Sequence, residues 1–400
     1  MSYTPPEKIL NRYAELLAGF GLRKCKGMQK GDVVAISVRE SARPMLQPLR
    51  DAVLRRGGFP IIRYFPDGMD KSFYDLATDE QLKFSPNKYL KGYVDQIDGM
   101  IIIDSDADPK ELEGVPSDKL IKTAEAGQKY WEWRDKKERE GKFSWTLALY
   151  GTPAMAKEAG MSIEDYWGEI INACYLNNKS PIEKWREIDQ ENRRVRTALT
   201  KMPIAKLHVQ AKNIDFSVEM GPNRKWSGGE GCNLPSFEIF TSPDCRTAEG
   251  EITFTEPLYH NGSLIKDVYL KFKNGRVVDY KASCGASALE SIVGAKNGDR
   301  VGEFSLTDRR ASKIKRFMAT TLFDENVGGR QGNMHIALGS SYPETYNGDV
   351  SKMSKKEMEN VGFNFSAVHV DIITTEKRTV TAILRDGTEI IIYRDGKFLV

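Results

Sequence analysis

An imidazole and a carboxylate stand two residues apart near the C-terminal end, in the apolar run SAVHVDII over residues 366–373. Two residues is the side-chain repeat of a β-strand, so His369 and Asp371 are expected on one face and the apolar residues between them on the other. Burying either group without a partner costs several kcal/mol, roughly 2–7 for a neutral polar group and more for a charge. The partner is either a simple His–Asp hydrogen bond or a metal ion, and this stretch alone does not decide between them.

Three further potential ligands lie in short structured segments of the second half. Glu238 stands between large apolar residues in NLPSFEIFT, Glu303 follows a glycine in RVGEFSL, and His335 lies in NMHIALG just after a glycine-rich segment. Each carboxylate alone is more often half of a salt bridge. Together, two glutamates, two histidines and one aspartate are too many for one catalytic zinc, which keeps three protein ligands. They suit two divalent ions about 3.5–4 Å apart, bridged by a carboxylate.

The second half of the chain, which must position these residues, is predicted to be mainly antiparallel β. Asn274-Gly275, Asp386-Gly387 and Asp395-Gly396 each separate alternating apolar runs, which is the strongest short-range signal for a hairpin. A helix is expected over residues 308–322. His208 and His260, the latter in a predicted turn with Asn261, are expected to lie outside any site.

The first half alternates strands and helices, which predicts an α/β domain with a parallel sheet covered on both faces. Helices are expected over residues 6–18 and 43–56, and strands over 32–38, 59–65, 99–104 and 143–150. The strand ends lack a G-x-G-x-x-G or Walker pattern, so no nucleotide site is expected.

The length of 400 residues favours two domains, because one core seldom grows beyond roughly 250–300 residues. A long helix is predicted to begin at Ser180-Pro181-Ile182-Glu183, a capping pattern, and to end before Pro203. We therefore expect an N-terminal α/β domain over residues 1–203 and a C-terminal metal-binding catalytic domain over residues 204–400.

The composition excludes several classes of protein. With 59 basic and 56 acidic residues the net charge is +3, which gives no general case for nucleic acid or an anionic membrane as a partner. The first residues do not resemble a secretory signal and no apolar run approaches ~18 residues, so a cytoplasmic protein is expected. Five scattered cysteines without a C-x-x-C spacing are expected to be reduced.

Five segments, NLPSFEIFTSPD, VGEFSL, LFDEN, HIALGSSYPE and SAVHVD, occur in this order. With them nearly the whole chain resembles the metallo-aminopeptidases of the aminopeptidase T and aminopeptidase S type. The resemblance implies a homodimer that removes amino-terminal residues from short peptides, with the site facing an enclosed cavity. It also implies two divalent ions, of zinc, cobalt, manganese or magnesium, and these metal ligands: Glu238, Glu303, His335, His369 and Asp371.

The resemblance further implies that Tyr342 is a catalytic phenol beside the metals. A bridging water of lowered pKa would attack the first carbonyl of the peptide, and a carboxylate near the metals would carry its proton to the leaving amine. Glu303 is our prediction for the bridging ligand and for a share of that proton transfer.

The chain departs from the family pattern in two places. Ser236-Phe237 stands where many members have Thr-Gly, and the segment between the DEN motif and His335 is longer and rich in glycine. Asp324 and Glu325 are expected either to hold this segment or to lie around His335. Two rival functions stay open, a metal-dependent amidohydrolase acting on a small non-peptide amide and a catalytically silent peptide-binding or metal-binding relative.

Overall fold

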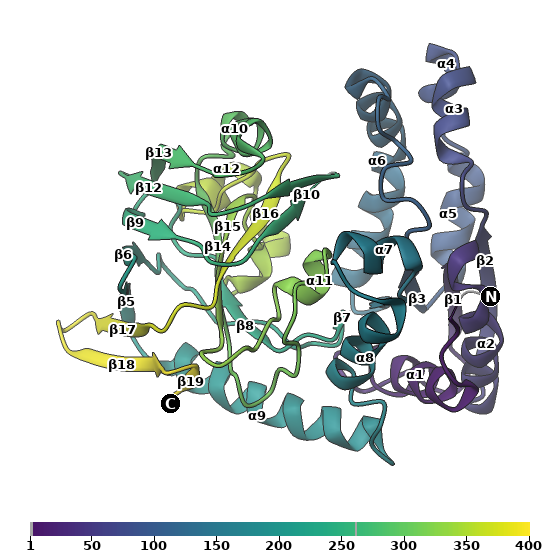
Figure 1. Cartoon of the computed structure of the whole chain (residues 1–400), viewed down its shortest axis with the longest axis horizontal. Coiled ribbons are helices and arrows are strands. Elements are labelled where there is room, and N and C mark those ends of the chain that lie inside the picture. The colour runs from purple at the N-terminus through teal and green to yellow at the C-terminus, as the bar shows by residue number, and fades with distance from the viewer. Residues whose placement is uncertain (1–2, 261) are drawn as a thin grey trace. The chain divides into compact units, whose positions relative to one another are not determined.

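The computed structural model describes residues 3–260 and 262–400, and its chain divides into two compact units (Figure 1). The N-terminal unit comprises the chain up to Arg186 together with Glu230–Leu234, and the C-terminal unit comprises Glu187–Gly229 and Pro235–Val400. The division falls inside helix α9 (Pro181–Lys201). The capping pattern at Ser180 had predicted this helix. The domain boundary at residue 203 follows this helix and stays a prediction, and Asn261 lies outside the described residues.

The N-terminal unit is built on a parallel sheet of order β2-β1-β3-β4-β7, which confirms the predicted α/β class. Its strands are β1 (Val33–Arg39), β2 (Phe59–Phe65), β3 (Gly99–Asp104), β4 (Ser144–Leu149) and β7 (Asn233–Leu234). Besides the start of α9, its helices are α1 (Glu7–Gly19), η1 (Glu40–Met45), α2 (Leu46–Arg55), α3 (Asp70–Leu76), α4 (Asp79–Leu82), α5 (Asn87–Gln96), α6 (Ser117–Arg139), α7 (Pro153–Glu158) and α8 (Ile163–Ala173).

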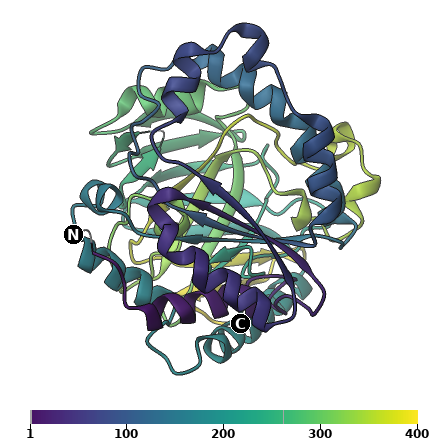
Figure 2. The same ribbon diagram turned by 90° about the vertical axis from the view of Figure 1, so that its right-hand side faces the viewer.

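Helices cover both faces of this sheet (Figures 1 and 2). Ala35 of β1 packs with Tyr93 and Val94 of α5 on one face. Its neighbours Val34 and Ile36 point to the other face, towards α2, and are also buried. None of the helices in the described ranges is both long and apolar enough to cross a membrane.

The C-terminal unit contains three antiparallel sheets, again as predicted. The largest has the order β13-β12-β9-β6-β5-β17-β18-β19, the second has the order β16-β15-β14-β8, and β10 pairs with β11. The strands are β5 (Ile204–Ala211), β6 (Ile214–Glu219), β8 (Glu238–Thr241), β9 (Glu249–Thr253), β10 (Leu258–His260), β11 (Ser263–Ile265), β12 (Tyr269–Lys273), β13 (Arg276–Lys281), β14 (Val301–Thr307), β15 (Asn333–Gly339), β16 (His369–Thr374), β17 (Thr379–Leu384), β18 (Glu389–Arg394) and β19 (Lys397–Phe398). The helices are α10 (Ala286–Gly294), α11 (Thr321–Asp324), η2 (Pro343–Thr345), η3 (Val350–Lys352) and α12 (Lys355–Asn360).

The three predicted hairpins are present, between β12 and β13, β17 and β18, and β18 and β19. Asn274 and Gly275 both have positive φ, 51° and 73°, as a tight turn of the type I′ kind requires.

The helix predicted over residues 308–322 is wrong, because most of this segment is an irregular loop and only α11 is helical. Side chains with short reach compete for the backbone groups that a helix would use. The Asp324 carboxylate accepts the N–H groups of Met318 at 2.6 Å and Thr320 at 3.0 Å, and the Ser312 hydroxyl donates to the Asn326 carbonyl at 2.5 Å. The apolar residues that suggested a helix are buried from the loop instead, as Ile314 and Met318 show.

One face of the four-stranded sheet is mainly apolar and contributes to the core of the C-terminal unit. Its residues pack with those of the eight-stranded sheet around Phe216 and Leu270. The residues that this face contributes are Ile239, Phe304, Leu306, Met334, Ile336, Leu338, Val370 and Ile372. The strand period of two leaves the intervening residues for the opposite face.

A β-bulge interrupts the pairing of β14 and β15 between Val301 and Glu303, directly before one predicted ligand. A Cβ on Gly302 would lie 2.2 Å from the Ser340 carbonyl oxygen and 2.6 Å from that of Gly339. Only glycine fits there, and the bulge sets the position at which Glu303 enters the sheet.

We expect Gly302→Ala to force the two strands apart and to destabilise the C-terminal unit by roughly 1–3 kcal/mol, as overpacking generally does. The measurement is the midpoint of thermal unfolding. Gly294→Ala is the matched control, because a Cβ on this glycine of α10 meets nothing within 4 Å. An unchanged midpoint for Gly302→Ala would contradict this reading of the bulge.

Candidate metal centre

The register of the four-stranded sheet decides where the predicted ligands point. Residues paired across strands share a face, as does every second residue along a strand. Ala337 of β15 pairs with Glu303 on one side and with Asp371 on the other, and His335 lies two residues before it. Glu303, His335 and Asp371 therefore lie on one face of the sheet, opposite the apolar core.

The other two predicted ligands join this face by the same rule. Gly339, at the end of β15, pairs with His369 of β16. Glu238, the first residue of β8, pairs with Thr307, which lies four residues after Glu303 on β14. The structure thus brings together five side chains from four strands, although Glu238 and Asp371 are 133 positions apart in the sequence.

Glu303 lies at the centre of the cluster. Its Oε1 is 3.3 Å from Nε2 of His335, and its Oε2 is 3.3 Å from Nε2 of His369. Glu303 belongs to two groups of potential metal ligands. In each group, one potential ligand atom from every residue lies within 4.8 Å of those from the others. The first group is Glu238, Glu303 and His335, and the second is Glu303, His369 and Asp371. One carboxylate with an oxygen towards each group has the arrangement of a bridging ligand.

The two imidazoles are oriented differently. The Nδ1 atom of His369 lies 2.8 Å from the Ser340 carbonyl oxygen and so donates its hydrogen there, which leaves Nε2 as the ring nitrogen that faces the carboxylates. Nε2 of His335 lies 3.5 Å from Glu238 and 3.8 Å from Asp371, while its Nδ1 is buried without a hydrogen-bond partner among the described residues. Both rings present a nitrogen to the carboxylate cluster, as metal-ligating histidines do.

The pKa values of the cluster show an excess of buried negative charge. Burial and the charge of Glu303 raise the pKa of Glu238 to about 8. Burial would lower the pKa of His335, but Glu303 and Asp371 outweigh it and raise this pKa to about 9. Burial likewise opposes protonation of His369, whose pKa the carboxylates raise to about 12. Without a cation, therefore, protons must neutralise these side chains.

Glu325, which we expected either to hold the glycine-rich segment or to lie around His335, interacts electrostatically with the carboxylates of the cluster. It is buried, and burial together with the charges of Glu238 and Asp371 raises its pKa well above the ordinary value. Asn326 donates to its Oε1 at 3.2 Å and accepts the N–H of Phe237 at 2.7 Å, which ties Glu325 to the segment that carries Glu238. The sequence feature that could have indicated this position of Glu325 is the second carboxylate of LFDEN, which stands next to apolar residues.

Asp324 has a different role from its neighbour Glu325. Its carboxylate accepts backbone N–H groups of the loop before it, so it holds that loop in place. Asn333 extends the support, since its amide donates to the carbonyl of Glu325 at 2.7 Å.

Tyr342 lies beside the cluster, where the resemblance placed it. Its ring is 4.6 Å from the His369 ring and 5.4 Å from the Phe240 ring between centroids. Its N–H donates to the Ser242 hydroxyl at 2.9 Å, which fixes the backbone. Desolvation and the charges of Glu303 and Asp371 raise the pKa of the phenol, so its hydroxyl keeps its proton and can donate a hydrogen bond.

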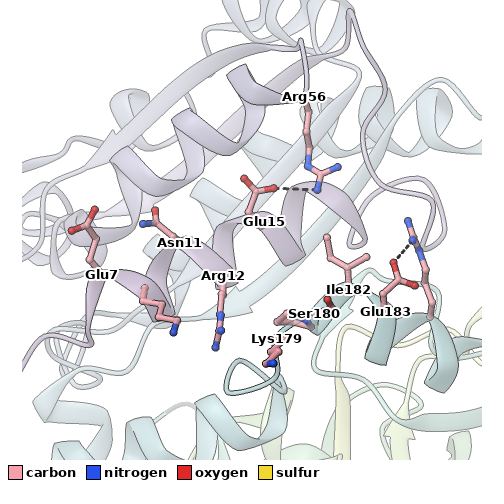
Figure 3. A pocket seen from close by; sticks show the side chains of 12 residues that line it. Glu7, Asn11, Arg12, Glu15, Arg56, Lys179, Ser180, Ile182 and Glu183 are labelled. Atoms are coloured by element: carbon pink, nitrogen blue, oxygen red, sulfur yellow. Dashed lines mark hydrogen bonds and ion pairs between the residues drawn. The ribbon is translucent and has the colours of Figure 1, made fainter.

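The remaining two histidines belong to neither of the two groups of potential ligand atoms found among the described residues. His208 of β5 lies 2.7 Å from the Asp215 carboxylate across a hairpin, and His260 ends β10. A pocket of about 830 Å³ in the N-terminal unit, between α1 and the start of α9, contains none of the predicted ligands (Figure 3). Several of its charges are already paired, such as Arg56 with Glu15 at 3.1 Å.

Comparisons with known proteins agree with this chemistry. A model of the thermophilic metalloprotease (M29) family matches residues 6–398. The chain is 28% identical over 411 residues to "Aminopeptidase AmpS" of Bacillus subtilis (strain 168), covering 97% of this chain and 98% of the relative. It is 27% identical over 416 residues to "Aminopeptidase PepS" of Streptococcus thermophilus, covering 98% of each.

The fold is also found in a solved structure, the wild-type AmpT from Thermus thermophilus. That structure matches with a TM-score of 0.82 at 24% identity, over 98% of this chain and 100% of the other. Since the family model spans almost the entire sequence, this chain belongs to the thermophilic metalloprotease (M29) family.

Proposed function

We propose that this chain is a metal-dependent aminopeptidase that removes the N-terminal residue from short peptides, using two divalent cations. The observation that carries the proposal is the position of Glu303, which belongs to both groups of potential ligand atoms and turns one oxygen towards each. The relatives named aminopeptidases support the choice of substrate.

The charge of the cluster fits two divalent cations. Four buried carboxylates, those of Glu238, Glu303, Glu325 and Asp371, carry four negative charges when ionised, and two neutral imidazoles add none. Two divalent ions would balance this charge, whereas one would leave half of it uncompensated in a buried place. Glu238 and His335 would hold one ion, His369 and Asp371 the other, with Glu303 shared. Carboxylates with imidazoles accept zinc, cobalt, manganese or magnesium.

The cations, when bound, would lower the pKa of a water molecule and polarise the carbonyl of the first peptide bond. The protein side chains then have three tasks. Tyr342, with its proton retained, donates a hydrogen bond to the carbonyl oxygen as negative charge develops there. Glu303 or Glu325 accepts the proton of the water and returns it to the leaving amine. The negative charge of the carboxylate cluster favours a substrate with a free amino terminus over one whose amine is acylated.

The proposed activity is tested on two substrates that differ only at the amino terminus. Leucine p-nitroanilide should be hydrolysed, and N-acetyl-leucine p-nitroanilide should not, because acetylation removes the amine that the site is proposed to recognise. A chelator should abolish the activity and a divalent cation should restore it. Equal hydrolysis of both substrates would favour a general amidohydrolase, and hydrolysis of neither, with cation bound, would favour a silent relative.

Tyr342→Phe should keep cation affinity and reduce kcat by about 10²–10³-fold, the usual effect of removing one donor to a developing oxyanion. Isothermal titration with a divalent cation and steady-state kinetics measure the two quantities. Tyr346→Phe is the matched control, since this hydroxyl accepts a hydrogen bond from the Asn223 side chain at 3.2 Å and should be dispensable. Full turnover in Tyr342→Phe would remove the phenol from the mechanism.

The metal-free protein should lose stability as the pH rises from 6 to 9. The pKa of Glu238 is raised from 4.5 to about 8 and that of His335 from 6.5 to about 9, so in this range the folded state holds more protons than the unfolded state. Unfolding then releases protons, and stability falls with rising pH. The contribution of His335 is complete below about pH 6.5 and is lost through about pH 9.

Thermal unfolding in a chelator at several pH values measures this dependence, and a saturating divalent cation should remove most of it by replacing the protons. His335→Asn should reduce the slope, whereas His208→Asn, a matched change outside the cluster, should leave it unchanged. A midpoint that rises with pH in the chelated protein would show that the cluster does not hold these protons.

A further inference from the structure

The backbone that follows β15 is used twice by the proposed site. Residues 340–342 leave the strand and have no regular secondary structure. The carbonyl of Ser340 accepts the hydrogen of His369 Nδ1 at 2.8 Å, and Tyr342 carries the phenol beside the cluster. The path of these three residues therefore sets the orientation of a proposed metal ligand and of the proposed oxyanion donor together.

The sheet alone does not determine this path. Gly339, the last residue of β15, has a φ of 106°, which residues with a side chain rarely adopt. A Cβ at this glycine would overlap the Val368 carbonyl oxygen, to which the N–H of Ser340 donates at 2.8 Å. After this bond the chain leaves the ladder, so its backbone groups need partners from outside the sheet.

Asn364 supplies these partners. It lies between α12 and β16 and is buried, with 3% of its surface exposed. Its Nδ2 donates to the Gly339 carbonyl at 2.6 Å and to the Asn297 carbonyl at 2.8 Å. Its N–H donates to the Ser341 hydroxyl at 2.9 Å, and its carbonyl accepts the N–H of Ser341 at 2.8 Å. Three of these four bonds thus end on the two residues on either side of Ser340.

The fourth bond anchors Asn364 to a turn outside this loop. Asn297 lies between α10 and β14, and its amide donates to the Phe365 carbonyl at 3.1 Å. Asn364 returns the contact through its bond to the Asn297 carbonyl. The two asparagines tie residues 364–365 to this turn twice, so Asn364 has a fixed position from which it can hold Gly339.

These contacts require a primary amide on a short side chain. The carbonyl oxygens of Gly339 and Asn297 both accept from one nitrogen, which must therefore carry two hydrogens. A serine hydroxyl has one hydrogen, and an ionised aspartate has none and would repel both oxygens. Glutamine has the same amide but an additional methylene, which would overpack a buried position. An alanine would leave both carbonyls without this donor.

We propose that Asn364 is a positioning residue of the proposed peptidase, and that it acts by fixing Ser340 between its two neighbours. The fixed carbonyl of Ser340 orients the imidazole of His369, and the chain that follows it places the phenol of Tyr342. The kinetic consequence of this arrangement rests on the proposed function, whereas the geometric consequence does not. The two are therefore tested separately.

The imidazole signals of the chelated protein test the geometry. The chain has four histidines, so labelling with ¹⁵N-histidine gives few signals to assign. The Nδ1–H of His369 should be protected from exchange by Ser340 in the unmodified protein, and Asn364→Ala should lose this protection. Val380→Ala is the control, because it leaves a cavity in the core at β17, in another sheet, and should keep the protected signal. A signal that stays protected in Asn364→Ala, or is unprotected in the unmodified protein, overturns the proposal.

Hydrolysis of leucine p-nitroanilide at saturating divalent cation tests the kinetic consequence. Asn364→Ala should lower kcat by about 10–100-fold, the usual effect of losing support for a metal ligand, and should leave KM unchanged. Val380→Ala should keep kcat. An unchanged kcat in Asn364→Ala overturns the positioning role.

Ser341→Ala is the second variant, and it keeps both tests decisive if Asn364→Ala does not fold. It removes only the acceptor of the Asn364 N–H, so the loss of protection and of kcat should be smaller and in the same direction. No change in either quantity overturns the proposal. If the unmodified protein does not hydrolyse the substrate, the proposed function fails, and the exchange measurement alone decides whether Asn364 holds the loop.

Discussion

The structure depends on one constraint, which is that a cluster of ionisable side chains is buried on one face of a four-stranded sheet. The apolar core occupies the other face, through residues such as Ile336 and Ile372. Because side chains alternate along a strand, a slip of one residue would put the carboxylates into the core and the apolar residues into the cluster. The hydrophobic pattern that folds the sheet therefore also selects the face on which the site forms.

The surrounding loops are explained by the same constraint. Buried carboxylates need neighbouring groups that are held in place, and the LFDEN segment contributes to this. Each of its three polar residues makes a different kind of contact. Asp324 holds the preceding loop, Glu325 adds a carboxylate to the cluster, and Asn326 links Glu325 to the segment that carries Glu238. The sequence alone does not indicate these three different roles, because the three residues are adjacent and all polar.

The parts of the fold and site that follow from the sequence are those governed by a short period or a local turn. The alternation around His369 and Asp371 fixed their common face, and Asn274-Gly275 specified a hairpin, because both signals act over a few residues. The helix expected over residues 308–322 failed because Asp324 and Ser312 bond to the loop backbone, and such contacts depend on tertiary position. The pairing of Glu303 with Ala337, which aligns the proposed ligands, likewise depends on sheet register and not on local sequence.

The position of the core also bears on how the site is assembled. In small zinc domains the cation drives folding, because little else holds the ligands together. Here Leu338 and Val370 are buried on the far side of the same strands that carry His335 and Asp371, so apolar burial alone can set the register. Protons on Glu238 and the imidazoles reduce the repulsion in the metal-free state. Apolar burial can therefore arrange the proposed ligands without a cation, and cation binding at the proposed site would replace protons by metal charge.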